Sequence, residues 1–469
     1  YFRFKFTKTL IENRKQMQYY NNLVLFFLAF FFAKANAQDL QDWGKYEGVK
    51  KEAILRIEKH RKGDATLKIT LPNNKQAKNA DVIIKLKKHE FKWGAVINTS
   101  FDTSPYSKKY KEVFLKYFNA AGFGLGLKPK HRGNIHEKVA EKIFPWLKDN
   151  GYYVRGHTIT WEGKKFMRPE DRAILADSNL TDKEKADKLI KSLSVHFTHA
   201  IPKWDVDCWD VSNEPIANND VNNLLPNYNT HVYWFKLADS IRQESGKEHV
   251  KLYQNDYRIV SITTPRDHKI KLKGYKAVGR LHIYKKILED QIAQGAPIEG
   301  IGFQSRIKNG LITPDTIYNR LRSFESFNLP YHATEFEVRD NKKIYMYSDE
   351  ERKLITEYMM VMYFSHPNVD GFWHWTFADT NSRKPLDYPL FNYDGTPKVT
   401  GKKWMELMDG FFSTDLKLTT DDKGEISMHG YYGDYELTTT IDGTAYKSNF
   451  KIISADDSKK KDVNLAFKP

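Results

Sequence analysis

The chain has 469 residues, of which 40% are hydrophobic and 14% aromatic, so it can bury a large core and is not a disordered protein. Its formal net charge is +16, but no compact basic helix or nucleic-acid-binding motif accompanies the charge, so nucleic acid is not an expected partner. The single cysteine, Cys208, excludes an internal disulfide, and the fold must therefore be held by its core.

Residues 1–37 are predicted to be upstream residues followed by a signal peptide, which begins at residue 17. The apolar run LVLFFLAFFFA (23–33) is followed by the small-x-small sequence ANA (35–37), a pattern typical of cleavage by signal peptidase. This run is too short to span a bilayer well, which disfavours the alternative of a membrane anchor. We therefore expect a secreted or periplasmic protein that has no membrane association after cleavage.

The next segment, residues 38–88, is predicted to be an N-terminal β module. TLKIT (66–70) and DVIIKLK (81–87) are rich in β-branched residues, and the sequence PNN (72–74) lies between them. These features favour two strands joined by a turn.

From residue 89 to residue 412, apolar strand-like runs alternate with amphipathic segments, which predicts a (β/α)8 barrel of the α/β class. An open doubly wound sheet is the alternative, but no glycine-rich phosphate loop follows the first strand. The expected strands are 91–97, 120–127, 152–161, 206–214, 250–257, 298–306, 331–338 and 369–377. The expected helices are 107–118, 135–149, 183–199, 231–245, 275–294, 313–326, 349–365 and 397–411.

Residues 413–469 return to a β pattern, with short strand-like runs separated by turn sequences such as DDKG and IDG. We expect this C-terminal β module to pack with the N-terminal module as one accessory β-sandwich beside the barrel.

Two carboxylates are predicted to face one cleft. In a barrel of this kind the carboxyl ends of the strands carry the active site, and Glu214 and Glu335 end or lie on strands four and seven, which face each other. Such a pair suits glycoside hydrolysis with retention, which requires about 5–5.5 Å between the carboxyl groups. Glu214 would act as acid and then base, and Glu335 as nucleophile. This chemistry requires no metal or organic cofactor.

The ordered motifs along the barrel carry a specific resemblance. RGHTITW (155–161), WDVSNEP (209–215), LYQNDY (252–257), EGIGFQS (299–305), TEFEV (334–338) and PLFNYDGTPK (389–398) resemble glycoside hydrolase family 10, which consists mainly of endo-β-1,4-xylanases. The resemblance covers roughly 90–405. It implies the same roles for Glu214 and Glu335 and a contact between Asn213 and the 2-hydroxyl of a sugar. It also implies glycone-side contacts from Lys128, His157, Trp161, Gln304 and Trp375.

The sequence departs from the family pattern in the glycone subsites. On the second strand only Lys128 is kept of a Glu-Asn-x-x-Lys pattern, and Arg383 stands where a tryptophan is expected. Arg306 replaces a histidine after strand six, and Glu337 replaces an aspartate. We expect Arg306 to bridge Glu335 and Glu337 as a planar fork and so to orient the nucleophile. The alternative is that Arg306 only fills space or contacts substrate.

The expected function is therefore hydrolysis of internal β-1,4 linkages of xylan by a protein that is expected to be a monomer. One alternative keeps the chemistry but uses an acidic or sulfated β-glycan, because the cleft rim would be basic. That rim would consist of Lys164, Lys165, Arg168, Arg306 and Arg383. A second alternative is a sugar-binding protein without catalysis. Two structural interpretations also remain open. The first is core packing of His157, Trp161 and Trp375, and the second is a solvated Lys128.

Overall fold

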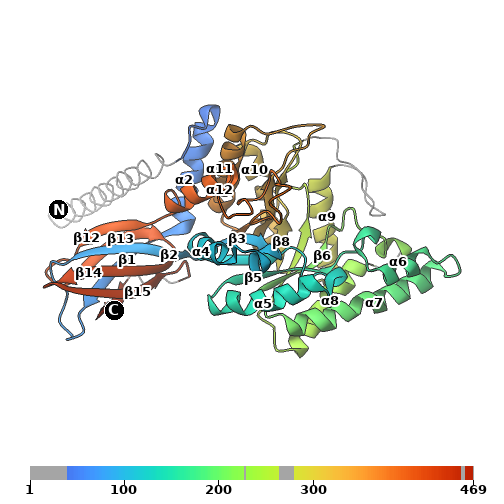
Figure 1. Ribbon diagram of the computed structural model, residues 1–469, viewed down its shortest axis with the longest axis horizontal. Helices are drawn as coiled ribbons and strands as arrows, with labels where there is room; N and C mark the ends of the chain where they lie inside the picture. Colours follow the sequence, from blue (N-terminus) through green and yellow to red (C-terminus); the bar gives the residue numbers. More distant parts are fainter. Residues whose placement is uncertain (1–39, 226–228, 264–278, 456–459, 468–469) are drawn as a thin grey trace, which may run out of the picture.

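The computed structural model describes residues 40–225, 229–263, 279–455 and 460–467. The predicted leader (1–37) and the first part of the helix predicted at 275–294 lie outside these residues. Figure 1 shows a barrel at one end of the long axis and a β-sandwich at the other. No helix within the described residues is long and apolar enough to cross a bilayer.

Eight parallel strands close into the predicted barrel. The ring is closed because β11 pairs with β3 on one side and with β10 on the other. The strands, in order, are β3 (Lys92–Ile97), β4 (Ala120–Phe123), β5 (Tyr153–Thr160), β6 (Cys208–Asn213), β7 (Lys251–Asp256), β8 (Gly300–Phe303), β10 (Tyr331–Val338) and β11 (Val369–His374). A short extra strand, β9 (Arg306–Ile307), pairs with the end of β10.

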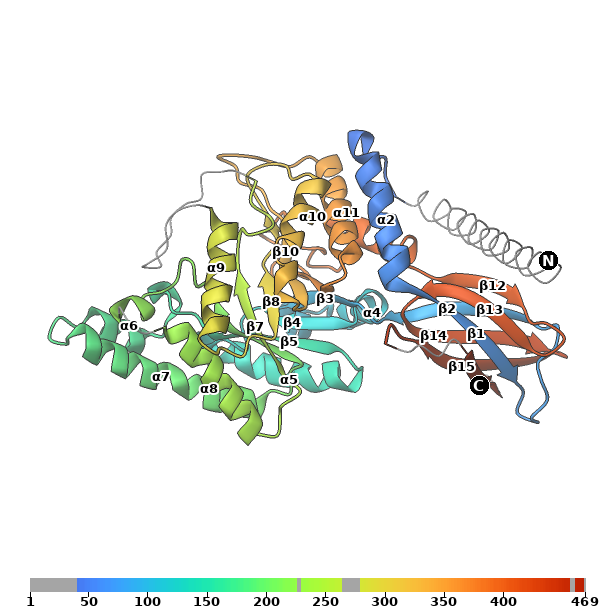
Figure 2. The ribbon, with the colours of Figure 1, turned by 180° about the vertical axis from the view of Figure 1, so that it is seen from behind.

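A helix follows each barrel strand and covers the sheet from outside, as Figure 2 shows for α5, α8, α9 and α10. These helices are α4 (Ser107–Tyr117), α5 (Ile135–Asp149), α7 (Asp182–Lys203), α8 (Thr230–Glu244), α9 (Arg280–Ala293), α10 (Pro314–Arg322), α11 (Asp349–Ser365) and α12 (Val399–Asp409). Short helices α3 (Ser100–Thr103) and α6 (Pro169–Ala176) lie in the loops. Capping boxes at Thr181 and Ser348 fix the starts of α7 and α11.

Large aromatic side chains fill the barrel interior opposite glycines. A Cβ atom on Gly94 would lie 2.3 Å from the indole of Trp373, and one on Gly156 would lie 2.3 Å from the indole of Trp209. Only glycine leaves room for these rings, which are fully buried. The strands around them are therefore rigid supports for the residues at their ends.

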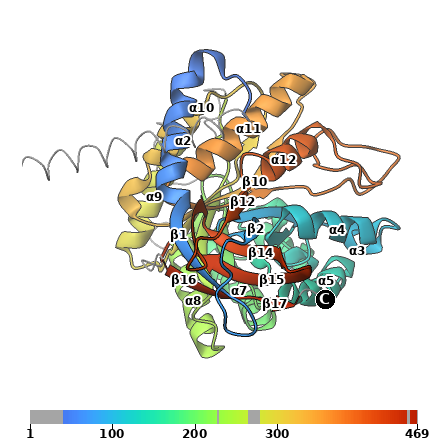
Figure 3. The ribbon, with the colours of Figure 1, turned by 90° about the vertical axis from the view of Figure 1, so that its left-hand side faces the viewer.

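The sandwich confirms the prediction that the N- and C-terminal pieces fold together. One sheet has the order β13 (Glu425–Tyr431), β1 (Lys62–Thr70), β16 (Lys460–Asn464). The other has the order β12 (Asp415–Thr419), β2 (Asp81–His89), β14 (Gly433–Ile441), β15 (Thr444–Ile452), β17 (Ala466–Phe467). Side chains from both sheets, among them Leu67, Ile84 and Leu437, share one apolar core. Figure 3 views the molecule from the sandwich end, with the barrel behind.

The sandwich meets the barrel near the amino-terminal ends of the strands. The imidazole of His89 bonds to the carbonyl of Phe412 at 2.5 Å, and the amide of Asn119, just before β4, donates to the carbonyl of His89 at 2.8 Å. The carboxyl ends of the strands, at the opposite end of the barrel, are left uncovered by the sandwich.

The N-terminal module contains a helix that the sequence analysis missed. Helix α2 (Glu47–Arg61) lies against α11 in Figures 1 and 2, and its side chains Ala53, Ile54 and Ile57 belong to the barrel core. These residues recur at helical spacing, which is the signal that was overlooked. Residues 38–88 are therefore not a purely β segment, and their first third packs on the barrel.

A buried carboxylate of the barrel binds this N-terminal segment. The carboxylate of Glu357 on α11 accepts a hydrogen bond from Trp43 Nε1 at 2.6 Å and contacts Lys403 Nζ at 2.7 Å. Both charged side chains are almost completely buried.

We expect Glu357→Ala to lower the free energy of unfolding by about 3–5 kcal/mol, because the buried donors on Trp43 and Lys403 both lose their acceptor and Lys403 keeps only the exposed Glu406, at 2.8 Å. Denaturant titration followed by circular dichroism measures the loss. Glu350→Ala, at an exposed position of the same helix, is the matched control. A loss below about 1 kcal/mol, the scale of an exposed pair, would contradict the interpretation.

Candidate active site

The carboxyl ends of the barrel strands open into one cleft of about 1010 Å³. It is lined by residues from the loops after β5, β6, β7, β8, β10 and β11. Eight of the predicted site residues line it: His157, Trp161, Glu214, Gln304, Arg306, Glu335, Glu337 and Trp375.

Glu214 follows the last residue of β6 and is held in an unusual backbone conformation. Its φ of 58° is in the left-handed region, which non-glycine residues rarely adopt, and its N–H donates to the carbonyl of Asn255 at 2.8 Å. Both carboxyl oxygens are bonded. Oε1 accepts from Gln304 Nε2 at 2.8 Å, and Oε2 accepts from Asn218 Nδ2 at 2.7 Å and Trp161 Nε1 at 3.3 Å.

The environment of Glu214 favours its protonated form. Burial raises the pKa of this carboxyl group to about 7, although the hydrogen bond from Gln304 acts in the opposite direction. The negative charges of Asp256 and Glu335 add to the increase. A carboxyl group with a pKa near 7 can both donate and accept a proton at neutral pH.

Glu335 lies on β10 and is held by a charged fork. Arg306 donates from Nε at 3.0 Å and from Nη2 at 2.5 Å to Oε2 of Glu335, and from Nη1 at 2.8 Å to Oε1 of Glu337. The other oxygen of Glu335 lies 3.5 Å from Asn255 Nδ2 and 3.8 Å from His157 Nε2. The guanidinium thus fixes one carboxylate oxygen and leaves the other directed toward neutral partners.

Buried polar side chains fix the positions of His157 and Asn213. His157 Nδ1 bonds to the carboxylate of Asp210 at 2.8 Å, and burial lowers the pKa of this imidazole, so that it is neutral at pH 7. Asn213 Oδ1 accepts from Asn255 Nδ2 at 3.0 Å, while Asn213 Nδ2 is buried and has no partner among the described residues. An amide donor therefore remains available beside Glu214 and Glu335.

Lys128 lies behind two of the indoles that line the cleft. Its Nζ is 5.1 Å from the ring centre of Trp161 and 5.3 Å from that of Trp375. Burial lowers the pKa of this lysine to about 8. Lys128 is thus a buried cation held by aromatic faces, not a solvated lysine.

Comparisons with known proteins show which family this chain belongs to. The model of glycosyl hydrolase family 10 matches residues 83–405, which is more than half of the chain. The chain belongs to glycosyl hydrolase family 10. It is 25% identical over 397 residues to "Anti-sigma-I factor RsgI6" from Acetivibrio thermocellus, covering 84% of this chain and 47% of that protein. It is 25% identical over 394 residues to "Endo-1,4-beta-xylanase 3" from Arabidopsis thaliana, covering 81% and 46%.

Solved structures share the fold. Xylanase 10B from Thermotoga petrophila in complex with xylobiose matches with a TM-score of 0.54 at 20% identity, covering 68% of this chain and 94% of that chain. Native xylanase 10B from Thermotoga maritima matches with a TM-score of 0.53 at 20% identity, covering 68% and 95%. By contrast, the chain spans about half or less of the length of the curated relatives described above.

Two predicted rim cations of this family 10 protein are not in the cleft. Arg383 is exposed in the loop after β11, where its backbone N–H donates to Asn381, and it is not among the cleft-lining residues. Arg168 is turned away and bound to the buried carboxylate of Asp171, with Nε–Oδ2 at 3.0 Å. The expected rim of five cations is therefore corrected: Lys164, Lys165 and Arg306 line the cleft, and these two do not.

The sequence analysis missed three residues that organise the site. Asn218 donates to Glu214, Asp210 orients His157, and Asn255 contacts both Asn213 and Glu335. Asp210 and Asn255 are polar residues within apolar strand runs, and both are fully buried. A polar residue at such a position indicates a side chain that is hydrogen-bonded in the fold, and this pattern is present in the sequence. Asn218 is in the loop after β6, and nothing in the sequence distinguishes it from an ordinary loop residue.

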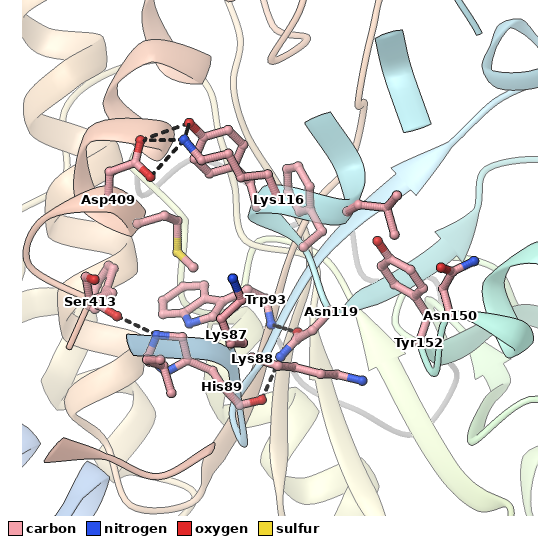
Figure 4. Close-up of a pocket in the computed structure, with 16 residues that line it drawn as sticks. Lys87, Lys88, His89, Trp93, Lys116, Asn119, Asn150, Tyr152, Asp409 and Ser413 are labelled. Atoms are coloured by element: carbon pink, nitrogen blue, oxygen red, sulfur yellow. Dashed lines mark hydrogen bonds and ion pairs between the residues drawn. The ribbon is translucent and has the colours of Figure 1, made fainter. Parts of the chain in front are cut away.

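A second cavity, shown in Figure 4, shares no lining residue with the cleft. It has a volume of about 140 Å³ and lies where the sandwich meets the barrel, between His89, Trp93 and Ser413. Asn119 and Tyr152, at the amino-terminal ends of β4 and β5, also line it. Neither Glu214 nor Glu335 lines this cavity.

We expect Gln304→Met to move the alkaline limb of the pH profile of kcat/KM to higher pH, by about one unit or less. The amide of Gln304 lowers the pKa of Glu214, so its removal raises that pKa and keeps the acid protonated to higher pH. Initial rates measured across pH test this. Gln294→Met, at an exposed position after α9, is the control. An alkaline limb that stays in place or moves to lower pH would show that Gln304 does not lower the pKa of Glu214.

Proposed function

We propose that this family 10 protein hydrolyses internal β-1,4 linkages of xylan with retention, using Glu214 as acid and base and Glu335 as nucleophile. The observation that carries the proposal is the pairing, in one cleft, of a carboxyl group with a pKa near 7 and a carboxylate held by Arg306. The printed names of several relatives, endo-1,4-β-xylanases, and the xylobiose in a structural neighbour support the substrate class.

In the first step, Glu335 Oε attacks the anomeric carbon while the bond from this carbon to the glycosidic oxygen breaks. The proton on Glu214 passes to that oxygen, so the leaving sugar departs as a neutral alcohol. Glu214 becomes a carboxylate that is bonded by Gln304 and Asn218, and Glu335 becomes a glycosyl ester. Loss of the negative charge on Glu335 removes one of the interactions that raised the pKa of Glu214.

In the second step, Glu214 removes a proton from a water molecule that attacks the same anomeric carbon. The ester bond to Glu335 breaks, and both carboxyl groups return to their starting states. Two inversions at one carbon give a product with the original β configuration. The unpartnered amide of Asn213 is proposed to donate to a sugar hydroxyl during both steps.

The test is a product profile over a panel of β-linked polysaccharides, with xylan, glucan and mannan in parallel. We expect a mixture of xylo-oligosaccharides at early times, with the β anomer formed first in proton NMR. Release of the terminal sugar alone would contradict cleavage at internal linkages and would indicate exo cleavage. Formation of the α anomer first would contradict the retaining mechanism.

We expect Arg306→His to lower kcat by about tenfold or more, because hydrogen bonds between charged groups contribute about 1.5–3 kcal/mol and the histidine cannot reproduce the fork. An imidazole also loses its charge as pH rises past its pKa, so turnover should gain a pH dependence that the guanidinium does not impose. Arg322→His, on the exposed face of α10, is the control. Unchanged turnover and pH profile would count against the role.

Export and a monomeric state belong to the same proposal and stay predictions. Export depends on the leader predicted at 17–37, and N-terminal sequencing of protein recovered from outside the cytoplasm tests the cleavage before Gln38. The molar mass of the protein in solution tests the monomeric state.

A further inference from the structure

The described residues that line the cleft carry more positive than negative groups. Six are cationic: Lys164, Lys165, Arg172, Arg306, Lys308 and Arg339. Four are carboxylic acids: Glu214, Asp220, Glu335 and Glu337. The surplus grows further in the state that begins the reaction, because Glu214 is then protonated and neutral. A neutral polysaccharide can use these groups as hydrogen-bond donors but gains no net electrostatic attraction from the surplus.

Most of these cations are not neutralised by a neighbouring carboxylate. Arg306 is fully engaged by Glu335 and Glu337, and Arg339 approaches Glu337 only to 3.8 Å. Within the described part of the chain, the other four form no ion pair with a carboxylate: Lys164, Lys165, Arg172 and Lys308. Their charges therefore act on whatever enters the cleft.

Strand register places two of the cations directly beyond the fork that holds the nucleophile. Arg306 pairs with Glu337 across β9 and β10, and the N–H of Arg339 donates to the carbonyl of Ile307 at 3.0 Å. Alternation along a strand then puts Lys308 on the face of Arg306 and Arg339 on the face of Glu337. All four side chains line the cleft. Lys308 is exposed, and the guanidinium of Arg339 rests 4.5 Å from the ring centre of Tyr388.

The geometry points to a subsite for an anionic substituent of the glycan, built on Lys308 and Arg339 beside Glu335. Its ligand is a carboxylate or a sulfate ester carried by the chain that is being cleaved. The inference rests on the proposed function, since it concerns which form of the polysaccharide this cleft prefers. The cations across the cleft, at Lys164 and Lys165, add a long-range attraction for the same charge.

A charge-matched pair of substrates tests this subsite. The first is glucuronoxylan, and the second is the same polymer after chemical reduction of its uronate groups to neutral hexose, which keeps the branching and removes the charge. The ratio of kcat/KM for the two polymers is measured at about 20 mM and about 500 mM salt, where screening is weak and strong. Sulfated and unsulfated linear xylan form a parallel arm, which separates a sulfate ligand from a carboxylate ligand.

We expect the acidic polymer of at least one arm to be cleaved severalfold faster than its neutral partner at low salt, with the advantage shrinking at high salt. In Lys308→Gln combined with Arg339→Gln, the ratio should fall by about two- to fivefold for each charge removed. Because the ratio compares two substrates of one variant, any general loss of turnover cancels. Lys417→Gln, exposed on β12 of the sandwich, should leave the ratio as in the wild type.

Equal or faster cleavage of both neutral polymers at every salt concentration would overturn the inference and leave the hydrolase assignment standing. A low-salt advantage that the double variant retains in full would overturn the assignment of the subsite to Lys308 and Arg339. If the wild type cleaves none of the four polymers, the proposed function itself fails, and the inference fails with it.

Discussion

Replacing Glu335 by alanine is expected to lower kcat on xylan by at least about 10⁴-fold, the scale seen when a catalytic nucleophile is removed. Of the other described carboxyl groups in the cleft, Glu337 shares Arg306 but lies two residues further along β10, and Glu214 and Asp220 lie in the loop after β6. Release of reducing ends measures the loss. The fold should survive, since Arg306 keeps Glu337 as its partner.

A small anion distinguishes loss of the nucleophile from a general disturbance. In Glu335→Ala, azide can occupy the vacated space and attack an activated aryl β-xylobioside once, which gives an α-glycosyl azide. Glu289→Ala, exposed on α9, should retain full turnover and form no azide adduct. Residual wild-type-like turnover in Glu335→Ala, or an azide product of β configuration, would show that another group is the nucleophile.

The barrel could be predicted because its signals are local. Each strand is a short apolar run, each helix is amphipathic, and the polar residues stand at one end of each run, as at Asn213 and Glu214. Once the strands are assigned, the topology of a barrel brings all their carboxyl ends to one place. The eight runs, and the cleft that Glu214 and Glu335 share, therefore followed from the sequence.

The details of the cleft depend on loops, and loops could not be predicted in the same way. Arg383 and Arg168 were expected at the rim because they lie near strand ends in the sequence, yet their loops turn them outward or toward Asp171. Conversely, Lys308 and Arg339 lie in the cleft because β9 pairs with the end of β10, and a two-residue strand gives almost no sequence signal. Long-range pairing decides such positions.

The effect of replacing Glu214 on the rate is expected to depend on the leaving group of the substrate. This dependence separates the role of Glu214 from that of Glu335. In Glu214→Gln, kcat/KM on xylan should fall by about 10²–10⁴-fold, because a sugar alkoxide leaves poorly without a proton. A dinitrophenyl β-xylobioside needs no proton to leave, so its first step should be nearly unchanged. The glycosyl ester on Glu335 should then accumulate as a burst, because no base activates water for the second step.

Added azide should restore turnover in Glu214→Gln and give a β-glycosyl azide, the configuration opposite to that from Glu335→Ala. The pH profile provides an independent measurement. Burial raises the pKa of Glu214 to about 7, so in the wild type kcat/KM should fall as pH rises through this value and the acid loses its proton. Glutamine does not titrate, so this alkaline limb should vanish in the variant. An alkaline limb that persists in Glu214→Gln would assign the titration to another group and would remove Glu214 as the acid.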